Sequence, residues 1–171
     1  RGNGDRDLCG GVQRCFSIGR SCLLVDQRAA GESQGKVITF GIKEHRDCLA
    51  WVDFMVEHFG PDVKIILTGI SMGASTVLMA AGAPLPPQVK GVLADCGFTS
   101  PWEVVCSVLK ATNTIPVFPF AHFARPISHL LAHFGLKEAT TIDAMKTCKV
   151  PIFFAHGKKD RFVPYEMSIE N

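Results

Sequence analysis

The chain alternates between short apolar runs and longer segments whose apolar residues recur every three or four positions. The recurring pattern is typical of amphipathic helices, and the short runs are typical of strands buried on both faces. Helices are predicted over residues 5–19, 39–59, 71–82, 99–110 and 141–147. Strands are predicted over residues 21–25, 63–68, 89–94 and 150–155. This alternation predicts an α/β fold in which helices flank a parallel sheet.

Polar residues follow the predicted strands directly. Asp26 follows the first strand, Asp95 the third and His156 the fourth. In a parallel sheet the carboxyl ends of the strands meet at one edge, where functional residues gather. We therefore expect the functional site at that edge.

The strongest motif is G-x-S-x-G at residues 69–73, between a predicted strand and a predicted helix. A serine on such a sharp turn would present its hydroxyl above the edge of the sheet. We expect Gly69 and Gly73 to remove Cβ atoms that would clash in the turn and against the helix. The backbone N–H of Met72 would then face the oxyanion of an acyl intermediate. The alternative is a tight glycine turn that contains Ser71 only incidentally.

Two further segments, together with the serine motif, resemble those of a known family. Residues 26–33 (D-Q-R-A-A-G-E-S) resemble the D-x-R-x-H-G-x-S loop of the α/β-hydrolases, with Ala30 where the family usually has histidine. Residues 155–164 resemble the H-G-x-x-D-x-x-V-P segment that carries the catalytic acid in that superfamily. Together with the serine motif, they make the chain resemble part of an α/β-hydrolase, close to the serine-aminopeptidase-like and acyl-esterase-like branches.

The resemblance implies a catalytic triad that this stretch of sequence does not complete. Ser71 would be the nucleophile, and Asp160 would orient the catalytic histidine. Asp95 is the rival acid, because some family members place theirs one strand earlier. His156 belongs to the loop that presents the acid, so we expect it to be structural. In the family order the histidine comes last, so we expect it beyond Asn171 and expect this internal fragment to be inactive alone.

Residues 1–171 are predicted to form one partial α/β-hydrolase domain. Its region 111–135 is rich in proline and aromatic residues, and proline this dense prevents one continuous helix. A lid over a substrate pocket is one interpretation, with Phe118, Phe120 and Phe123 as its apolar residues. An irregular connection packed on the core is the other.

The composition of the chain argues against several classes of function. The hydrophobic fraction of 47% and the charged fraction of 20% are typical of a globular domain. A net charge of +2 without a basic cluster argues against nucleic-acid binding. The seven cysteines contain no C-x-x-C pair, which argues against a zinc ribbon or a thioredoxin-type site. Their odd number favours a reducing, cytoplasmic location.

The predicted function is therefore that of a serine hydrolase, which would cleave a small acyl or peptide substrate at an ester, thioester or amide bond. The resemblance implies no metal and no organic cofactor. An acyltransferase with the same serine turn is one alternative. A non-catalytic binding module that keeps the hydrolase fold is another. No apolar run reaches the roughly 18 residues that a membrane-spanning helix needs.

Overall fold

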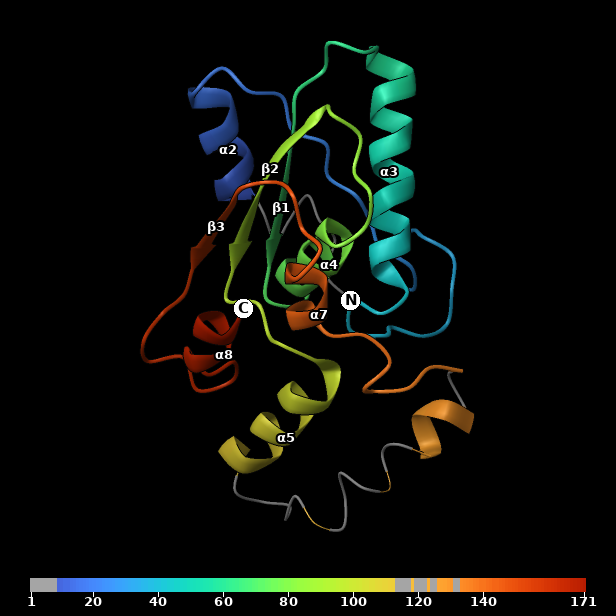
Figure 1. Cartoon of the computed structure of the whole chain (residues 1–171), viewed down its shortest axis with the longest axis vertical. Coiled ribbons are helices and arrows are strands. Elements are labelled where there is room, and N and C mark those ends of the chain that lie inside the picture. Colours follow the sequence, from blue (N-terminus) through green and yellow to red (C-terminus); the bar gives the residue numbers. More distant parts are fainter. Residues whose placement is uncertain (1–8, 113–117, 119–122, 124–125, 131–132) are drawn as a thin grey trace. The chain divides into compact units, whose positions relative to one another are not determined.

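The computed structural model describes residues 9–112, 118, 123, 126–130 and 133–171 (Figure 1). The chain divides into two compact units, Arg1–Ile38 and Thr39–Asn171. The first unit contains helix α2 (Cys9–Ser17), which confirms the described part of the helix predicted over residues 5–19. The second unit contains the sheet and the remaining helices.

The first unit differs from the prediction at residues 21–25, which do not form a strand. An apolar run becomes a strand only when a neighbouring strand supplies backbone hydrogen bonds, and in the described part of the chain none does so. The loop that follows is well defined. The Asp26 carboxylate accepts a hydrogen bond from the Glu32 N–H at 3.1 Å, and the Ser33 hydroxyl donates to the Asp26 carbonyl at 2.7 Å. A Cβ on Gly31, which has a φ of 51°, would lie 2.0 Å from that carboxylate.

The sheet of the second unit has three parallel strands in the order β1-β2-β3. They are β1 (Ile65–Ile70), β2 (Val89–Asp95) and β3 (Ile152–Ala155). Ile70 is in register with Asp95, and Asp95 is in register with Ala155. All three strands therefore end at the same edge, as predicted.

Some helices of this unit pack on the sheet, and others lie beyond the carboxyl ends of its strands (Figure 1). They are α3 (Glu44–Phe59), α4 (Met72–Ala81), α5 (Pro101–Thr112), α7 (Thr141–Met145) and α8 (Glu166–Glu170). Eight of the ten residues of α4 are buried, and most are small enough for the helix to lie close to the sheet. Figure 1 shows α5 and α8 beyond the carboxyl ends of the strands. The α/β class is confirmed, whereas α8 was not predicted.

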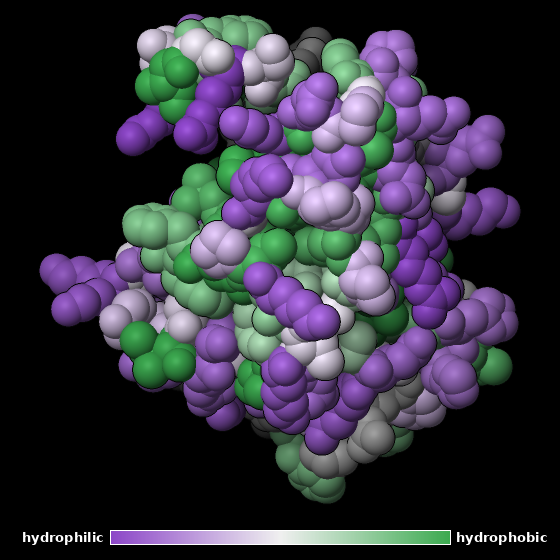
Figure 2. Space-filling model, turned by 45° about the horizontal axis from the view of Figure 1, so that its top comes forward, coloured by the Kyte–Doolittle hydropathy of each residue, from purple (hydrophilic) through white to green (hydrophobic). Residues whose placement is uncertain are grey.

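The hydrophobic core lies between α3, α4 and the sheet. Its buried members are Val52, Ile65, Leu67, Ala74, Val77, Leu78, Ala81, Val89, Val92 and Ala94. The alternate residues of the strands point away from this core and remain exposed, namely Ile66 (45%), Ile70 (50%), Leu93 (36%) and Phe153 (67%). Figure 2 accordingly shows hydrophobic side chains at the surface among polar ones. Within the described residues, no helix has both the length and the apolar character needed to cross a membrane.

The cysteine Cys48 shows how a thiol serves as an apolar filler in this core. It lies on α3 and packs against the core residues. Burial raises the pKa of the Cys48 thiol to about 11, and the nearby Asp47 carboxylate adds to the shift. The thiol is therefore protonated and uncharged at neutral pH.

Replacing Cys48 by alanine should change how stability depends on pH. The folded pKa lies above the ordinary value of 9.0, so the stability linked to the protonated thiol is fully present below pH 9. It is lost as the pH rises through about 11, by on the order of 2 kcal/mol. Urea unfolding at pH 8 and pH 11 should show a larger loss for the native chain than for Cys48→Ala. Equal losses in the two proteins would contradict this assignment.

Candidate functional site

Ser71 occupies the junction between β1 and α4, in a strained backbone conformation. Its φ of 53° and ψ of −115° lie in a region that residues with a side chain rarely adopt. The Ser71 N–H donates to the carbonyl of Asp95 at 2.8 Å, which ties the turn to the end of β2. The Ser71 carbonyl accepts from the Ser75 N–H at 3.1 Å and so begins the hydrogen bonding of α4. The chain thus changes direction from strand to helix at this residue.

The two glycines of the motif have different roles. A Cβ on Gly69 would lie 2.2 Å from the carbonyl carbon of Gly73 and 2.5 Å from the nitrogen of Ala74. A Cβ on Gly73 would meet no atom within 4 Å. The expectation that both glycines prevent a clash is therefore wrong for Gly73, because its own Cβ direction points into open space. The close approach of β1 to the first turn of α4 depends on Gly69.

Alanine substitutions should separate these two glycines. Gly69→Ala forces backbone atoms apart, so we expect a loss of roughly 1–3 kcal/mol or more in the free energy of unfolding. Gly73→Ala adds a methyl group in open space inside a helix, so we expect a gain of about 0.5–1 kcal/mol. Urea unfolding monitored by circular dichroism measures both values. Similar losses for the two variants would argue against the packing described at Gly69.

Two residues at the end of β2 lie beside this turn. Asp95 accepts from Ser71 through its carbonyl, and its side chain is half-buried. The next residue, Cys96, has a φ of 46° and donates its N–H to the Ala155 carbonyl at 2.8 Å. Burial raises the pKa of the Cys96 thiol, a backbone hydrogen bond from Ser71 opposes this, and the Asp95 and Asp160 carboxylates raise the pKa further.

Cys96 therefore lies beside the serine turn at the carboxyl edge of the sheet, because it follows Asp95, whose carbonyl accepts from Ser71. Because its pKa is raised, its thiol is protonated at neutral pH and is a poor nucleophile there. Cys96 was not among the predicted site residues. The available signal was its place next to Asp95, the residue that follows the strand predicted over 89–94.

Asp160 lies in the loop after β3, which holds its carboxylate in a fixed orientation. The Asp160 N–H donates to the Gly157 carbonyl at 3.0 Å. Its Oδ1 accepts from the N–H groups of Phe162 at 2.8 Å and Val163 at 3.0 Å. The side chain is 25% exposed, and Oδ2 lies 3.8 Å from Nε2 of His156. One oxygen is thus occupied by the loop, and the other can accept a further hydrogen bond.

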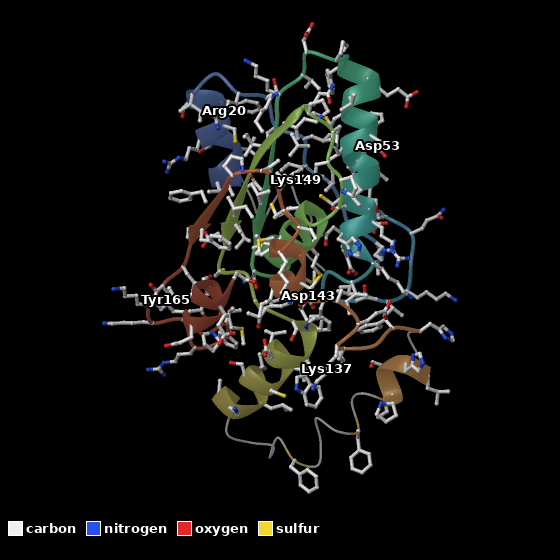
Figure 3. All side chains as sticks on the ribbon, in the orientation of Figure 1. Arg20, Asp53, Lys137, Asp143, Lys149 and Tyr165 are labelled. Carbon is white, nitrogen blue, oxygen red and sulfur yellow. The ribbon has the colours of Figure 1, made fainter. Side chains whose placement is uncertain are left out.

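His156 links the end of β3 to α8. Its side chain is only 2% exposed. Its Nε2 lies 2.8 Å from the Val163 carbonyl, and its Nδ1 lies 2.5 Å from the Ser168 hydroxyl. Because a carbonyl can only accept, Nε2 carries a hydrogen. The Tyr165 ring, labelled in Figure 3, packs edge-on at 6.0 Å. Both ring nitrogens are engaged, which leaves neither for Ser71.

A small apolar cluster lies beside the serine turn. Its buried members are Phe98, Val104 and Val163, and its half-buried members are Phe40, Met72, Val108 and Met167. Met72 brings the cluster next to Ser71, because it is the following residue and the first of α4. The N–H groups in the first turn of a helix have no partner within the helix, so the Met72 N–H is suited to an anion.

The serine turn and the strand and helix on either side of it lie in a stretch of the chain that matches a known family. The alpha/beta hydrolase fold family matches residues 2–107. The chain belongs to this family.

Known proteins resemble the chain in sequence or in structure. Protein YqkD of Bacillus subtilis, which is uncharacterized, is 28% identical over 149 residues, or 87% of this chain and 49% of that protein. An esterase of Pyrococcus furiosus superimposes with a TM-score of 0.71 at 23% identity and covers 95% of this chain. A lipase-esterase related protein of Clostridium acetobutylicum gives 0.66 at 18% identity and covers 96%. The chain spans 59% of the first structure and 74% of the second.

In this hydrolase fold, no imidazole of the described residues hydrogen bonds to Ser71. His45 contacts the Gly41 carbonyl through Nδ1 at 3.1 Å, and the His58 ring stacks on Phe54. His122 lies outside the described residues. The described residues also contain no group of three His, Cys, Asp or Glu side chains that could hold a metal ion.

The region predicted as a lid is described only in part. Phe118 and Phe123 are 73% and 60% exposed, so neither is packed in the core. Phe120 lies outside the described residues. The lid and the irregular connection packed on the core therefore both remain predictions.

Proposed function

We propose that the full-length protein is a serine hydrolase that cleaves an ester, thioester or amide bond through an acyl-enzyme on Ser71. The observation that carries this proposal is the strained turn that places Ser71 at the carboxyl edge of the sheet, where the loop of Asp160 also begins. Membership of the alpha/beta hydrolase fold family supports it. The esterase of Pyrococcus furiosus, with the same fold, supports an ester as the first substrate to test.

The proposed reaction uses these residues in two steps. A base takes the Ser71 proton while Oγ bonds to the carbonyl carbon, and the Met72 N–H stabilises the resulting oxyanion. The bond to the leaving group then breaks, and the leaving group receives the proton. Water repeats the sequence on the acyl-enzyme and releases the acid and the free serine. Asp160 would orient the base, a histidine that the described residues do not provide.

Labelling with a fluorophosphonate tests the nucleophile. The Ser71 oxygen would bond to phosphorus and displace fluoride, leaving a stable adduct that mass spectrometry locates. We expect the full-length protein to be labelled at Ser71 and Ser71→Ala to be unlabelled. Ser107→Ala, a half-buried serine of α5, is the control and should be labelled like the native protein. An adduct at another residue would refute Ser71 as the nucleophile, and the absence of any adduct would favour a non-catalytic binding module.

Paired amide variants test the acid. Asp160→Asn keeps an oxygen that can accept from Phe162 and Val163, so the loop should remain folded while the negative charge is lost. We expect the kcat for ester hydrolysis to fall on the order of 10³- to 10⁴-fold. Asp95→Asn should change kcat by less than about threefold, because Asp95 is not the proposed acid and its backbone carbonyl, which accepts from Ser71, is unchanged. The reverse order of effects would identify Asp95 as the acid.

A further inference from the structure

Phe40 has an unusual backbone conformation for an aromatic residue. Its φ of 55° lies in the left-handed region, where a bulky side chain is a genuine outlier. Ser71 and Cys96, two other residues with positive φ, belong to the site at the carboxyl edge. Strain of this kind persists only where the surrounding structure enforces it, and it concentrates at functional sites. The strained backbone at Phe40 therefore points to a functional role for this segment.

A buried carboxylate holds the turn that contains Phe40. Glu44, the first residue of α3, is fully buried. Its Oε1 accepts from the Thr39 N–H at 2.7 Å, and its Oε2 accepts from the Thr39 hydroxyl at 2.6 Å and the Gly41 N–H at 2.8 Å. The donors come from the residues on either side of Phe40. Three hydrogen bonds to one buried carboxylate thus close the turn around this single residue.

This turn lies against the helix that begins at the serine. A Cβ on Gly41, which has a φ of 98°, would lie 3.1 Å from the sulfur of Met79 and 3.5 Å from the nitrogen of Thr76, both on α4. The Thr76 hydroxyl in turn donates to the Met72 carbonyl at 2.8 Å. The Phe40 side chain packs in the apolar cluster that contains Met72. The turn therefore packs the Phe40 ring on the same buried cluster of Phe98, Val104 and Val163 as Met72, the residue that follows Ser71.

We propose that Phe40 is a specificity-determining residue that forms one wall of a site for an aliphatic acyl group beside Ser71. This inference rests on the proposed serine hydrolase function. The half-buried members of the cluster, Phe40, Met72, Val108 and Met167, present uncharged surface there. The thioethers of the two methionines adapt readily to a flexible chain. Glu44 is then a positioning residue, because it acts only through the turn that holds Phe40.

The test compares acyl chain lengths in the full-length protein. The quantity measured is kcat/KM for p-nitrophenyl octanoate divided by kcat/KM for p-nitrophenyl acetate. Phe40→Ala should lower this ratio on the order of 10-fold, because contacts to the long chain are lost while the acetate barely reaches the ring. Phe40→Gly removes the ring and also the backbone strain, so it should give the same ratio as Phe40→Ala. Phe54→Ala, at a half-exposed ring on α3 outside the cluster, is the matched control and should leave the ratio unchanged.

Glu44→Gln tests the positioning role. The amide replaces one acceptor oxygen with a donor that faces N–H or O–H groups, so the turn should loosen. We expect the same direction of change in the ratio, and no further fall when Glu44→Gln is combined with Phe40→Ala. Additive effects of the two substitutions would refute the coupling between Glu44 and Phe40.

The outcomes separate this inference from the proposed function. If the native protein forms no fluorophosphonate adduct on Ser71, the proposed function and this inference both fail. If the adduct forms and esters are cleaved, but the ratio is unchanged in Phe40→Ala or falls equally in Phe54→Ala, only the inference about Phe40 fails. Circular dichroism of each variant shows that the compared proteins are folded.

Discussion

The contact between Gly69 and the first turn of α4 is the constraint on which the site depends. At this point the backbone of β1 approaches the helix so closely that even a methyl group would overlap the carbonyl of Gly73. The short distance forces the chain to reverse within one residue, and Ser71 takes up the resulting strain. Because Ser71 also donates to the Asp95 carbonyl, the turn is fastened to the neighbouring strand end. The backbone at Ser71 is thus held both by the helix that follows and by the neighbouring strand.

Buried hydrogen bonds hold the loops around this turn. Ser75, one helical turn after Ser71, accepts from the Phe98 N–H at 2.8 Å and donates to its carbonyl at 2.9 Å, so α4 fastens the segment that follows Cys96. The carboxylate of Glu44, on α3, likewise holds the turn of Phe40. Burying a polar group without hydrogen-bond partners costs free energy, and the side chains of Ser75 and Glu44 both have such partners. Each strained residue of the site is therefore accompanied by satisfied polar contacts that lie out of reach of water.

Local patterns were most reliable where a signal is repeated or chemically specific. The alternation of apolar runs and helical periods predicted the three observed strands to within two residues at each end. The segment 21–25 had the same apolar character but forms no strand, because pairing depends on a partner elsewhere in the chain. The helix predicted from residue 39 begins at Glu44, because that side chain closes a turn that periodicity does not reveal.

The sequence by itself determined the α/β class, the place of Ser71 between a strand and a helix, and the loop of Asp160 after a later strand. Those features follow from neighbours in the chain, whose spacing is visible in the sequence. The tertiary structure alone decided that Gly69 and not Gly73 is sterically required, that Cys96 lies beside Ser71, and that Phe40 packs on the same apolar cluster as Met72. Each of these depends on atoms brought together from distant segments or on the direction of a single bond, and sequence spacing contains neither.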